Sequence, residues 1–263
     1  MLDAAPLQIE LLPRAAYSAL DSVDGCVLGI AMEPQRGVHA IDSDRRMDFQ
    51  SRFGEMSFKP AGMAVFSESP QGGEYLLVRT RAADTSFVQD RPQWLADKQT
   101  LSWACRLRAA LTSGTASWDQ LSGLAQGFVF HAWSAAGNVP PAQDKLRRAY
   151  EPVALWVERA LDEGRHADLR LEVLAGLTEE SVFQFLRGFS RAFGLTPHAY
   201  VAERRLQQAR RIAADPWVPL AEVAAAAGYA SQSHMGASFR RMLGTTPAEW
   251  RLGACRARIS RTG

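Results

Sequence analysis

The chain has 263 residues, enough for one large domain or two modest ones with a substantial buried core. Hydrophobic residues make up 47% and charged residues 22% of the sequence, as in globular proteins, and no apolar run approaches the ~18 residues that span a bilayer. The net charge of +2 is unevenly distributed, because residues 165–263 hold 14 Arg, no Lys and 8 acidic residues (+6), which leaves −4 for the other residues. A basic C-terminal part beside a mildly acidic partner is typical of a nucleic-acid binder.

The N-terminal segment and the cysteines indicate the cytoplasm. Acids and prolines stand where a secretory signal would need a basic start and an apolar stretch. The three cysteines, Cys26, Cys105 and Cys255, lie far apart without metal-ligand spacing, so we expect reduced thiols. We therefore expect a cytoplasmic protein with no membrane segment.

The first ninety residues predict a β-domain. Gly and Pro recur at short intervals and separate short runs suited to strands, such as Cys26–Met32, Glu55–Lys59 and Glu74–Thr80. Short strands with regular turn signals are typical of a β-sandwich or a small barrel.

From Trp94 onward the pattern is helical. Apolar residues recur at three- and four-residue spacing along Asp97–Leu111, Trp118–Ala135 and Asp144–Leu161. Gly164 ends the third helix and marks a domain boundary. We place the domains at residues 1–95 (sensor or oligomerisation), 96–164 (helical connector with dimerisation helices) and 165–263 (DNA binding).

The last hundred residues contain an internal duplication with an offset of fifty residues. The matched pairs are Ser181 and Ser231, Phe189 and Phe239, Arg191 and Arg241, Gly194 and Gly244, Thr196-Pro197 and Thr246-Pro247, and Tyr200 and Trp250. A stacked solenoid needs about three or more such units and lacks this Gly-x-Thr-Pro punctuation. Two units therefore favour a different architecture.

Each duplicated unit, at about 171–194 and 220–244, predicts two short helices joined by a tight turn. The second helix begins at a serine that can cap free backbone N–H groups and ends at a glycine that tolerates a left-handed cap. Thr-Pro then starts the next helix, with Thr as the cap and Pro at the first helical position. A long helix over His198–Ala214 links the two units. A turn between two short helices is the geometry that enters a DNA major groove.

The segments GLTPHAYVAERRLQQARR, at 194–211, and PLAEVAAAAGYASQSHMGASFRRMLGTTPAEW, at 219–250, resemble the AraC/XylS-type transcriptional regulators. The resemblance covers about a hundred residues. It implies binding to asymmetric promoter sites, with one major-groove segment for each helix-turn-helix unit.

The resemblance also implies which residues meet DNA. The base-facing positions correspond to Phe183, Leu186 and Arg187 in the first unit, and to Gln232, Ser233, His234 and Ala237 in the second. An arginine pairs bidentately with guanine, a glutamine pairs with adenine, and an aromatic ring meets a thymine methyl. The further DNA contacts that we expect are Arg204, Arg205, Arg210 and Arg211 of the linking helix, with Arg240 and Arg241 at the end of the second unit.

Three positions depart from the family's pattern. Glu179 occupies the turn position that usually holds glycine, where a left-handed conformation would cost about 1 kcal/mol or more. Leu186 and Ala237 are apolar where the family often has a polar or basic reader. We therefore expect fewer direct base contacts and more dependence on phosphates and DNA shape.

The segment from Gly54 to Val65 resembles the second cupin motif, a glycine, five residues and then Pro-x-Gly. Val65 stands where a metal-binding cupin has a histidine, and a metal site usually needs about three protein ligands. We expect no metal and no cofactor. The sequence contains no nucleophile–base motif, phosphate loop or His-Glu-x-x-His, so we do not expect an enzyme.

These observations predict an α+β multidomain protein: a cupin-like β-sandwich or jelly roll, a helical connector and an all-α double helix-turn-helix domain. The expected function is transcription regulation at double-stranded promoter DNA, by a homodimer that answers to a small-molecule effector and, if it is an activator, contacts RNA polymerase. In the alternative, the N-terminal half binds a protein or only dimerises. The effector-binding residues are not specified by the sequence.

Overall fold

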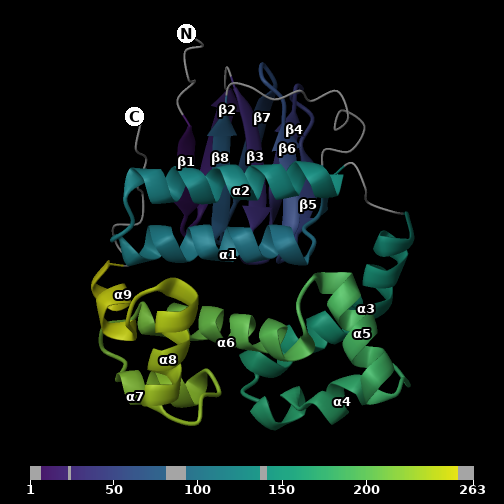
Figure 1. Ribbon diagram of the computed structural model, residues 1–263, viewed down its shortest axis with the longest axis vertical. Coiled ribbons are helices and arrows are strands. Elements are labelled where there is room, and N and C mark those ends of the chain that lie inside the picture. The colour runs from purple at the N-terminus through teal and green to yellow at the C-terminus, as the bar shows by residue number, and fades with distance from the viewer. Residues whose placement is uncertain (1–6, 23–24, 81–92, 137–140, 254–263) are drawn as a thin grey trace. The chain divides into compact units, whose positions relative to one another are not determined.

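The computed structural model describes residues 7–22, 25–80, 93–136 and 141–253 (Figure 1). They fall into two compact units, one before and one after residue 138. The first unit is a β-sandwich with two helices, and the second is entirely helical. The predicted combination of an N-terminal β-sandwich with a C-terminal double helix-turn-helix domain is confirmed.

Two antiparallel sheets form the sandwich. The strands are β1 (Gln8–Leu12), β2 (Tyr17–Ser22), β3 (Cys26–Ala31), β4 (Gln35–Ile41), β5 (Met47–Ser51), β6 (Glu55–Lys59), β7 (Ala64–Ser69), β8 (Tyr75–Thr80) and β9 (Gln93–Leu95). One sheet has the order β1-β8-β3-β6-β9 and the other the order β2-β7-β4-β5. The three runs predicted as strands are β3, β6 and β8, and all three lie in the five-stranded sheet.

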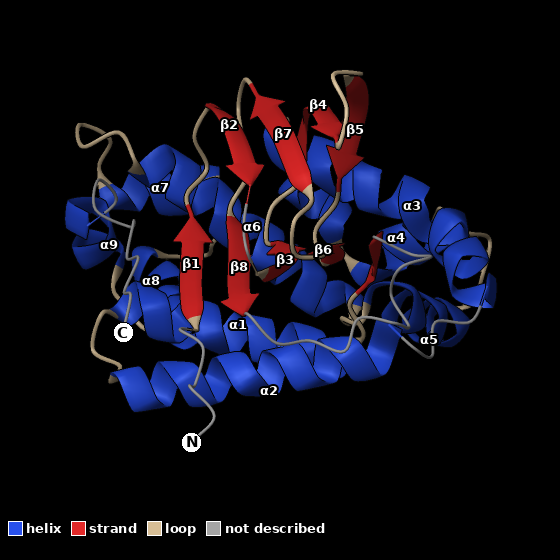
Figure 2. Ribbon diagram, turned by 90° about the horizontal axis from the view of Figure 1, so that it is seen from above, coloured by secondary structure: helices blue, strands red, loops and turns tan. Residues whose placement is uncertain are grey.

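Two helices cover the outer face of the five-stranded sheet (Figure 2). These helices, α1 (Lys98–Ser113) and α2 (Trp118–Ala136), match two of the three predicted between the strands and residue 164. The ring of Trp133 on α2 packs edge-on against Phe58 of β6, at 4.8 Å between centroids. The apolar core of this unit therefore lies between sheet and helices, and its sheet side consists of Ile9, Leu11, Leu28, Ile30, Met56, Phe58, Leu76 and Val78, each at most 8% exposed.

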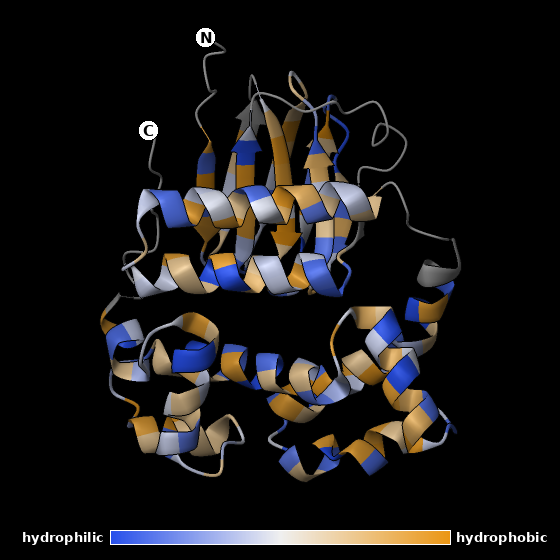
Figure 3. Cartoon of the chain, viewed as in Figure 1, coloured by the Kyte–Doolittle hydropathy of each residue, from blue (hydrophilic) through white to orange (hydrophobic). Residues whose placement is uncertain are grey.

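The helices of the second unit are α3 (Pro141–Asp162), the 3₁₀ turn η1 (His166–Leu169), α4 (Leu171–Gly176), α5 (Val182–Phe193), α6 (Pro197–Ala213), α7 (Leu220–Ala226), α8 (Gln232–Leu243) and α9 (Pro247–Gly253). Blue and orange segments alternate along these helices in Figure 3, since each helix turns one apolar face inward.

Helix α3 belongs to this second unit, whereas α1 and α2 belong to the first. The three helices expected to form one connector over residues 96–164 are thus divided between the units. The reason is that α3 makes its buried contacts with α5 and α6, through Tyr150 and Glu158. Of the three cysteines, Cys26 lies in β3 and Cys105 in α1, while Cys255 lies outside the described residues.

Candidate nucleic-acid interface

The first helix-turn-helix unit consists of α4 and α5. The Ser181 hydroxyl accepts a hydrogen bond from the Gln184 backbone N–H, and the Gln184 side chain accepts one from the Ser181 N–H, so a capping box starts α5. Gly194, with φ +69°, ends the helix as predicted. In the turn, Glu179 has φ +56°, which confirms that an L-residue here adopts the left-handed conformation.

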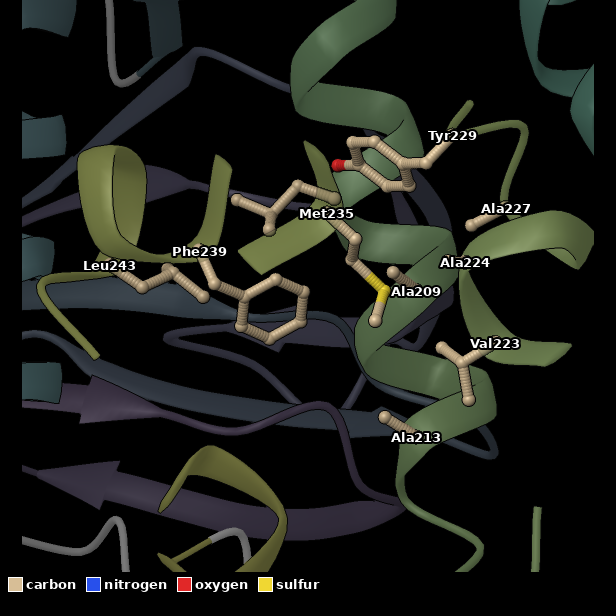
Figure 4. Close-up of a cluster of buried hydrophobic side chains, with 10 residues drawn as sticks. Ala209, Ala213, Val223, Ala224, Ala227, Tyr229, Met235, Phe239 and Leu243 are labelled. Carbon is tan, nitrogen blue, oxygen red and sulfur yellow. The ribbon is translucent and has the colours of Figure 1, made fainter. Parts of the chain in front are cut away.

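The second unit, α7 and α8, repeats this geometry. Ser231 caps α8 by accepting from the His234 N–H at 3.1 Å, and Gly244 ends the helix with φ +68°. Gly228 has φ +77° in the turn, at the position that Glu179 occupies in the first unit. Figure 4 shows the core that holds the unit together, with Met235 and Phe239 of α8 directed toward Ala209 of α6 and Val223 of α7.

The predicted readers of the first unit lie on the exposed side of α5. Phe183 is 66% exposed, although an aromatic ring of this size is usually covered. The Arg187 guanidinium lies over the Phe183 ring, at 5.6 Å from its centroid, and Arg187 is itself exposed. Leu186 is partly buried. Phe183 and Arg187 therefore form one exposed pair, and Leu186 lies at its edge.

The predicted readers of the second unit lie on the exposed side of α8. Gln232, Ser233, His234 and Ala237 are all exposed. The His234 ring packs edge-on against Tyr229 of the preceding turn, at 5.3 Å between centroids. In the last turn of the helix Arg240 and Arg241 are exposed as well.

The four arginines of α6 differ from the expectation of a uniform basic stripe. Arg204 is only 3% exposed, and its Nε lies 2.5 Å from Glu158 of α3. The prediction of a DNA contact at Arg204 is therefore not supported, because the guanidinium is buried against a carboxylate. The spacing of polar residues along α6 predicts an exposed face at this position, but α3 covers that face.

The other three arginines of α6 are partly exposed. Burial lowers the pKa of Arg205 from its ordinary value. Arg210 donates to Gln207 at 2.7 Å and lies over the Trp250 ring of α9, and Arg211 is 3.5 Å from Asp162 of α3. Each has a protein neighbour, so a phosphate would compete with or add to contacts already made.

Two elements outside the predicted site hold it in shape. Arg251 of α9 donates to the backbone carbonyls of Ala213 and Val218, at 3.1 and 2.7 Å, and so fixes the loop before α7. His166 of η1 lies against the turn of the second unit, where a Cβ on Gly228 would be 2.5 Å from its Nδ1. No local sequence pattern marks either residue, because each acts on a segment distant in the chain.

Comparison with known proteins agrees with this geometry. A family model described as a helix-turn-helix domain matches residues 174–253. The chain is 32% identical over 114 residues to the HTH-type transcriptional regulator ExsA of Pseudomonas aeruginosa, which is 42% of this chain and 39% of ExsA. Residues 174–253 form a helix-turn-helix domain of the AraC type.

Two solved structures resemble the AraC-type domain. One is a probable AraC family transcriptional regulator from Rhodopseudomonas palustris CGA009, with 26% identity, 43% of this chain covered, 99% of that chain covered and a TM-score of 0.34. The other is the DNA-binding domain of AdpA in complex with a target DNA, with 30% identity, 41% and 95% covered and a TM-score of 0.36. The curated relatives are named as transcription regulators and not as enzymes, and the chain spans about two fifths of the length of ExsA.

The described residues contain neither a metal-ligand cluster nor a membrane-spanning helix. Within the described ranges, no group of three or more His, Cys, Asp or Glu side chains is placed to hold a metal ion. No helix in the same part of the chain is long and apolar enough to cross a membrane.

Proposed function

We propose that this chain is a bacterial cytoplasmic transcription regulator that inserts α5 and α8 into successive major-groove segments of promoter DNA. The observation that carries the proposal is the pair of capped helices whose exposed sides bear the predicted readers, while their opposite sides form two separate cores. The exposed side of α5 includes Phe183, a large aromatic side chain that is 66% exposed.

We assign the base contacts to Arg187 for guanine, Gln232 for adenine and Phe183 for a thymine methyl. Ser233 and His234 are adaptable donors or acceptors, and Leu186 and Ala237 contribute only apolar contact. We assign phosphate contacts to the exposed residues Arg240 and Arg241. We also assign them to three partly exposed arginines of α6, Arg205, Arg210 and Arg211. Arg204 is left out because of its ion pair with Glu158.

The test of this function is binding of the full chain to duplex DNA selected from a random pool. A specific duplex should emerge, and its log K should fall linearly with log salt, by about 0.9 for each phosphate neutralised. Binding that selects no sequence, or that is flat with salt, would contradict the proposal.

For the N-terminal half we propose a small polar effector, bound between the two sheets of the cupin-like sandwich. Inner faces of a β-sandwich are normally apolar. Here the apolar core lies on the helix side of the five-stranded sheet, and the alternate residues of the same strands face the second sheet. Several of these are polar and half-buried, among them Ser57, Tyr75 and Arg79.

The polar groups between the sheets are held in hydrogen-bonded pairs. A hydrogen bond of 2.7 Å joins the hydroxyls of Tyr75 and Ser57, and the Tyr75 ring crosses Gly29, where a Cβ would lie 2.4 Å from it. On the opposite sheet the Tyr17 hydroxyl is 3.1 Å from that of Ser67. Hydroxyls that are fixed in this way suit a ligand that is itself rich in hydrogen-bonding groups.

The alternative, an N-terminal half that only binds a protein or a second copy, is favoured by Phe130 of α2, which is 68% exposed. A thermal-shift screen of small polar metabolites separates the two. A hit that stabilises the wild type but not Gly29→Val, whose side chain would displace the Tyr75 ring, supports an effector. If every hit acts equally on Gly29→Val, the assignment to the inter-sheet space is wrong.

A further inference from the structure

Tyr150, on α3, lies outside both helix-turn-helix units but contacts the recognition helix of the first one. Its side chain is 4% exposed. The ring packs against Phe185 and Phe189 of α5, with centroids 6.1 and 6.2 Å apart. These phenylalanines lie on the inward side of α5, opposite the exposed readers.

The Tyr150 hydroxyl reaches past the ring contacts to two points on the first unit. It donates to both carboxylate oxygens of Glu180, at 2.7 and 3.0 Å. It also lies directly against the helix at Gly188, where a Cβ would be 1.8 Å from the oxygen. Any side chain at position 188 would therefore displace the hydroxyl, and glycine is the residue that lets α3 and α5 approach so closely.

The hydrogen bond to Glu180 is present throughout the physiological pH range. Burial, together with the neighbouring carboxylate, raises the pKa of Tyr150 to about 12. The phenol therefore keeps its proton and can donate. A hydrogen bond to a charged acceptor is stronger than a hydrogen bond to a neutral acceptor. This hydrogen bond therefore favours a single conformation of the turn between α4 and α5, which contains Glu180.

The two points that Tyr150 contacts lie on either side of the reading segment. Glu180 precedes Ser181, the cap of α5, and Gly188 follows Arg187. Phe183 and Arg187, the exposed pair, lie between them. A helix held at its entry and again two turns later is restrained from rotating about its axis or sliding along it.

Among the residues that the structure describes, no side chain of another helix makes the matching pair of contacts with the second helix-turn-helix unit. The positions that match Glu180 and Gly188 at the fifty-residue offset are Ala230 and Ser238, neither of which carries a carboxylate. Its own turn supplies Tyr229 instead, whose ring contacts His234. The restraint from α3 is therefore a property of the first unit.

We propose that Tyr150 is a positioning residue that sets how sharply the first unit discriminates between bases. The inference rests on the proposed DNA-binding function. Tyr150 touches no DNA itself; it acts by holding α5 at Glu180 and at Gly188, so that Arg187 meets the base edge in one orientation.

The experiment uses the full chain and the duplex selected from a random pool, with single base changes placed in either half of the site. Tyr150→Phe removes the hydroxyl and keeps the ring, and Glu180→Ala removes the acceptor at an exposed position that leaves the core intact. Tyr200→Phe is the matched control, because it removes another buried hydroxyl, on α6, which lies 3.5 Å from Glu158 of α3.

Tyr150→Phe should reduce discrimination in the half read by the first unit by about tenfold, the effect of losing one good base contact, and leave the other half unchanged. Glu180→Ala should reproduce this loss, and the double variant should add little, because both changes remove the same hydrogen bond. Tyr200→Phe should leave discrimination in both halves intact.

Two outcomes overturn the inference: unchanged discrimination in Tyr150→Phe and Glu180→Ala, or an equal loss in both halves that follows the loss of thermal stability. Each is distinct from failure of the proposed function, in which the wild type itself selects no duplex. Should Tyr150→Phe fail to fold, Glu180→Ala alone decides between these outcomes.

Discussion

Under the proposed function, Arg187 and Phe183 are two neighbouring side chains with different roles in base reading. The planar guanidinium can pair with both acceptors of guanine, and the ring beneath it limits the orientations that the arginine adopts. In the second unit the position that matches Arg187 at the fifty-residue offset is Ala237, which contributes no polar group, and Gln232 is the nearest counterpart as a base reader. The first unit is therefore expected to supply the stricter base selection.

Replacing Arg187 by alanine should cost about 1–3 kcal/mol on the specific duplex and relax the preference at one position. Arg240→Ala or Arg241→Ala, as phosphate-contact controls, should weaken all duplexes about equally and make the salt slope shallower by about 1. The measurement compares specific and random duplexes at two salt concentrations. Equal weakening of both by Arg187→Ala would make Arg187 a phosphate contact.

The two turns adopt a left-handed backbone at matched positions, with Glu179 in the first and Gly228 in the second. Gly228→Ala should destabilise the second unit by about 2 kcal/mol or more, because the left-handed backbone and the contact with His166 both oppose a Cβ. Glu179→Ala should change stability by less than about 0.5 kcal/mol, since Glu179 already has a Cβ in that conformation. Urea unfolding of the two variants checks this, and comparable losses would show that turn strain is not the cause.

At the scale of elements, α3 is part of the DNA-binding unit. It supplies Glu158, which pairs with the buried Arg204, and Tyr150, which covers Phe185 and Phe189. Without α3 these groups would be left exposed or unpaired, and a buried charge that loses its partner is costly.

A fragment of residues 139–253 should therefore unfold cooperatively, whereas one of residues 165–253 should be less stable by at least about 3 kcal/mol or fail to fold. In the longer fragment, Glu158→Ala should reproduce most of this loss, while Asp162→Ala, at an exposed ion pair, should cost less than about 1 kcal/mol. Circular dichroism during urea unfolding measures both. Equal stability of the two fragments would mean that α3 only rests on the domain.

The 3₁₀ turn η1 is expected to make the stability of the second helix-turn-helix unit depend on pH, through His166. Burial, then the charge of Arg205, lowers the pKa of His166 below its ordinary value. The unfolded chain therefore binds this proton more readily than the folded chain, so the neutral ring contributes stability above about pH 6.5 that is lost as pH falls through the lowered value.

Between pH 7.5 and 5.5 the melting temperature of the 139–253 fragment should fall, and His166→Gln should reduce this pH dependence. His198→Gln, at an exposed histidine, is the control and should leave the dependence unchanged. A pH profile that is the same in His166→Gln and in the wild type would remove His166 as its origin.

At the scale of the whole molecule, the charge is concentrated where DNA is expected to bind. Residues 165–263 carry +6 and the remaining residues −4. The negatively charged N-terminal residues gain nothing from approaching phosphates, so the DNA contacts should all come from the residues after 138.

The salt slope of DNA binding by a fragment of residues 139–263 should therefore match that of the full chain, counted per DNA-binding domain. Fluorescence anisotropy over a salt series measures both slopes. A full-chain slope steeper by several units would place additional phosphate contacts in the N-terminal half.

The sequence by itself determined the duplicated helix-turn-helix units. Their limits depend on residues three or four positions apart: Ser181 and Ser231 at the starts, Gly194 and Gly244 at the ends, and the apolar spacing between them. Such short-range interactions form within one segment, so the spacing of residues is enough to predict them. The left-handed turn at Glu179 was expected from the resemblance to the AraC/XylS-type regulators, in which this position usually holds glycine.

Only the tertiary structure decided which faces are covered. Arg204 has the spacing of a surface arginine but lies against Glu158, forty-six residues earlier. The polar residues between the two sheets alternate with core residues, and their strands pair with partners far apart in the chain, such as β1 with β8. Burial depends on which segments meet across such distances. The spacing of residues within one segment does not predict which distant segment will cover it.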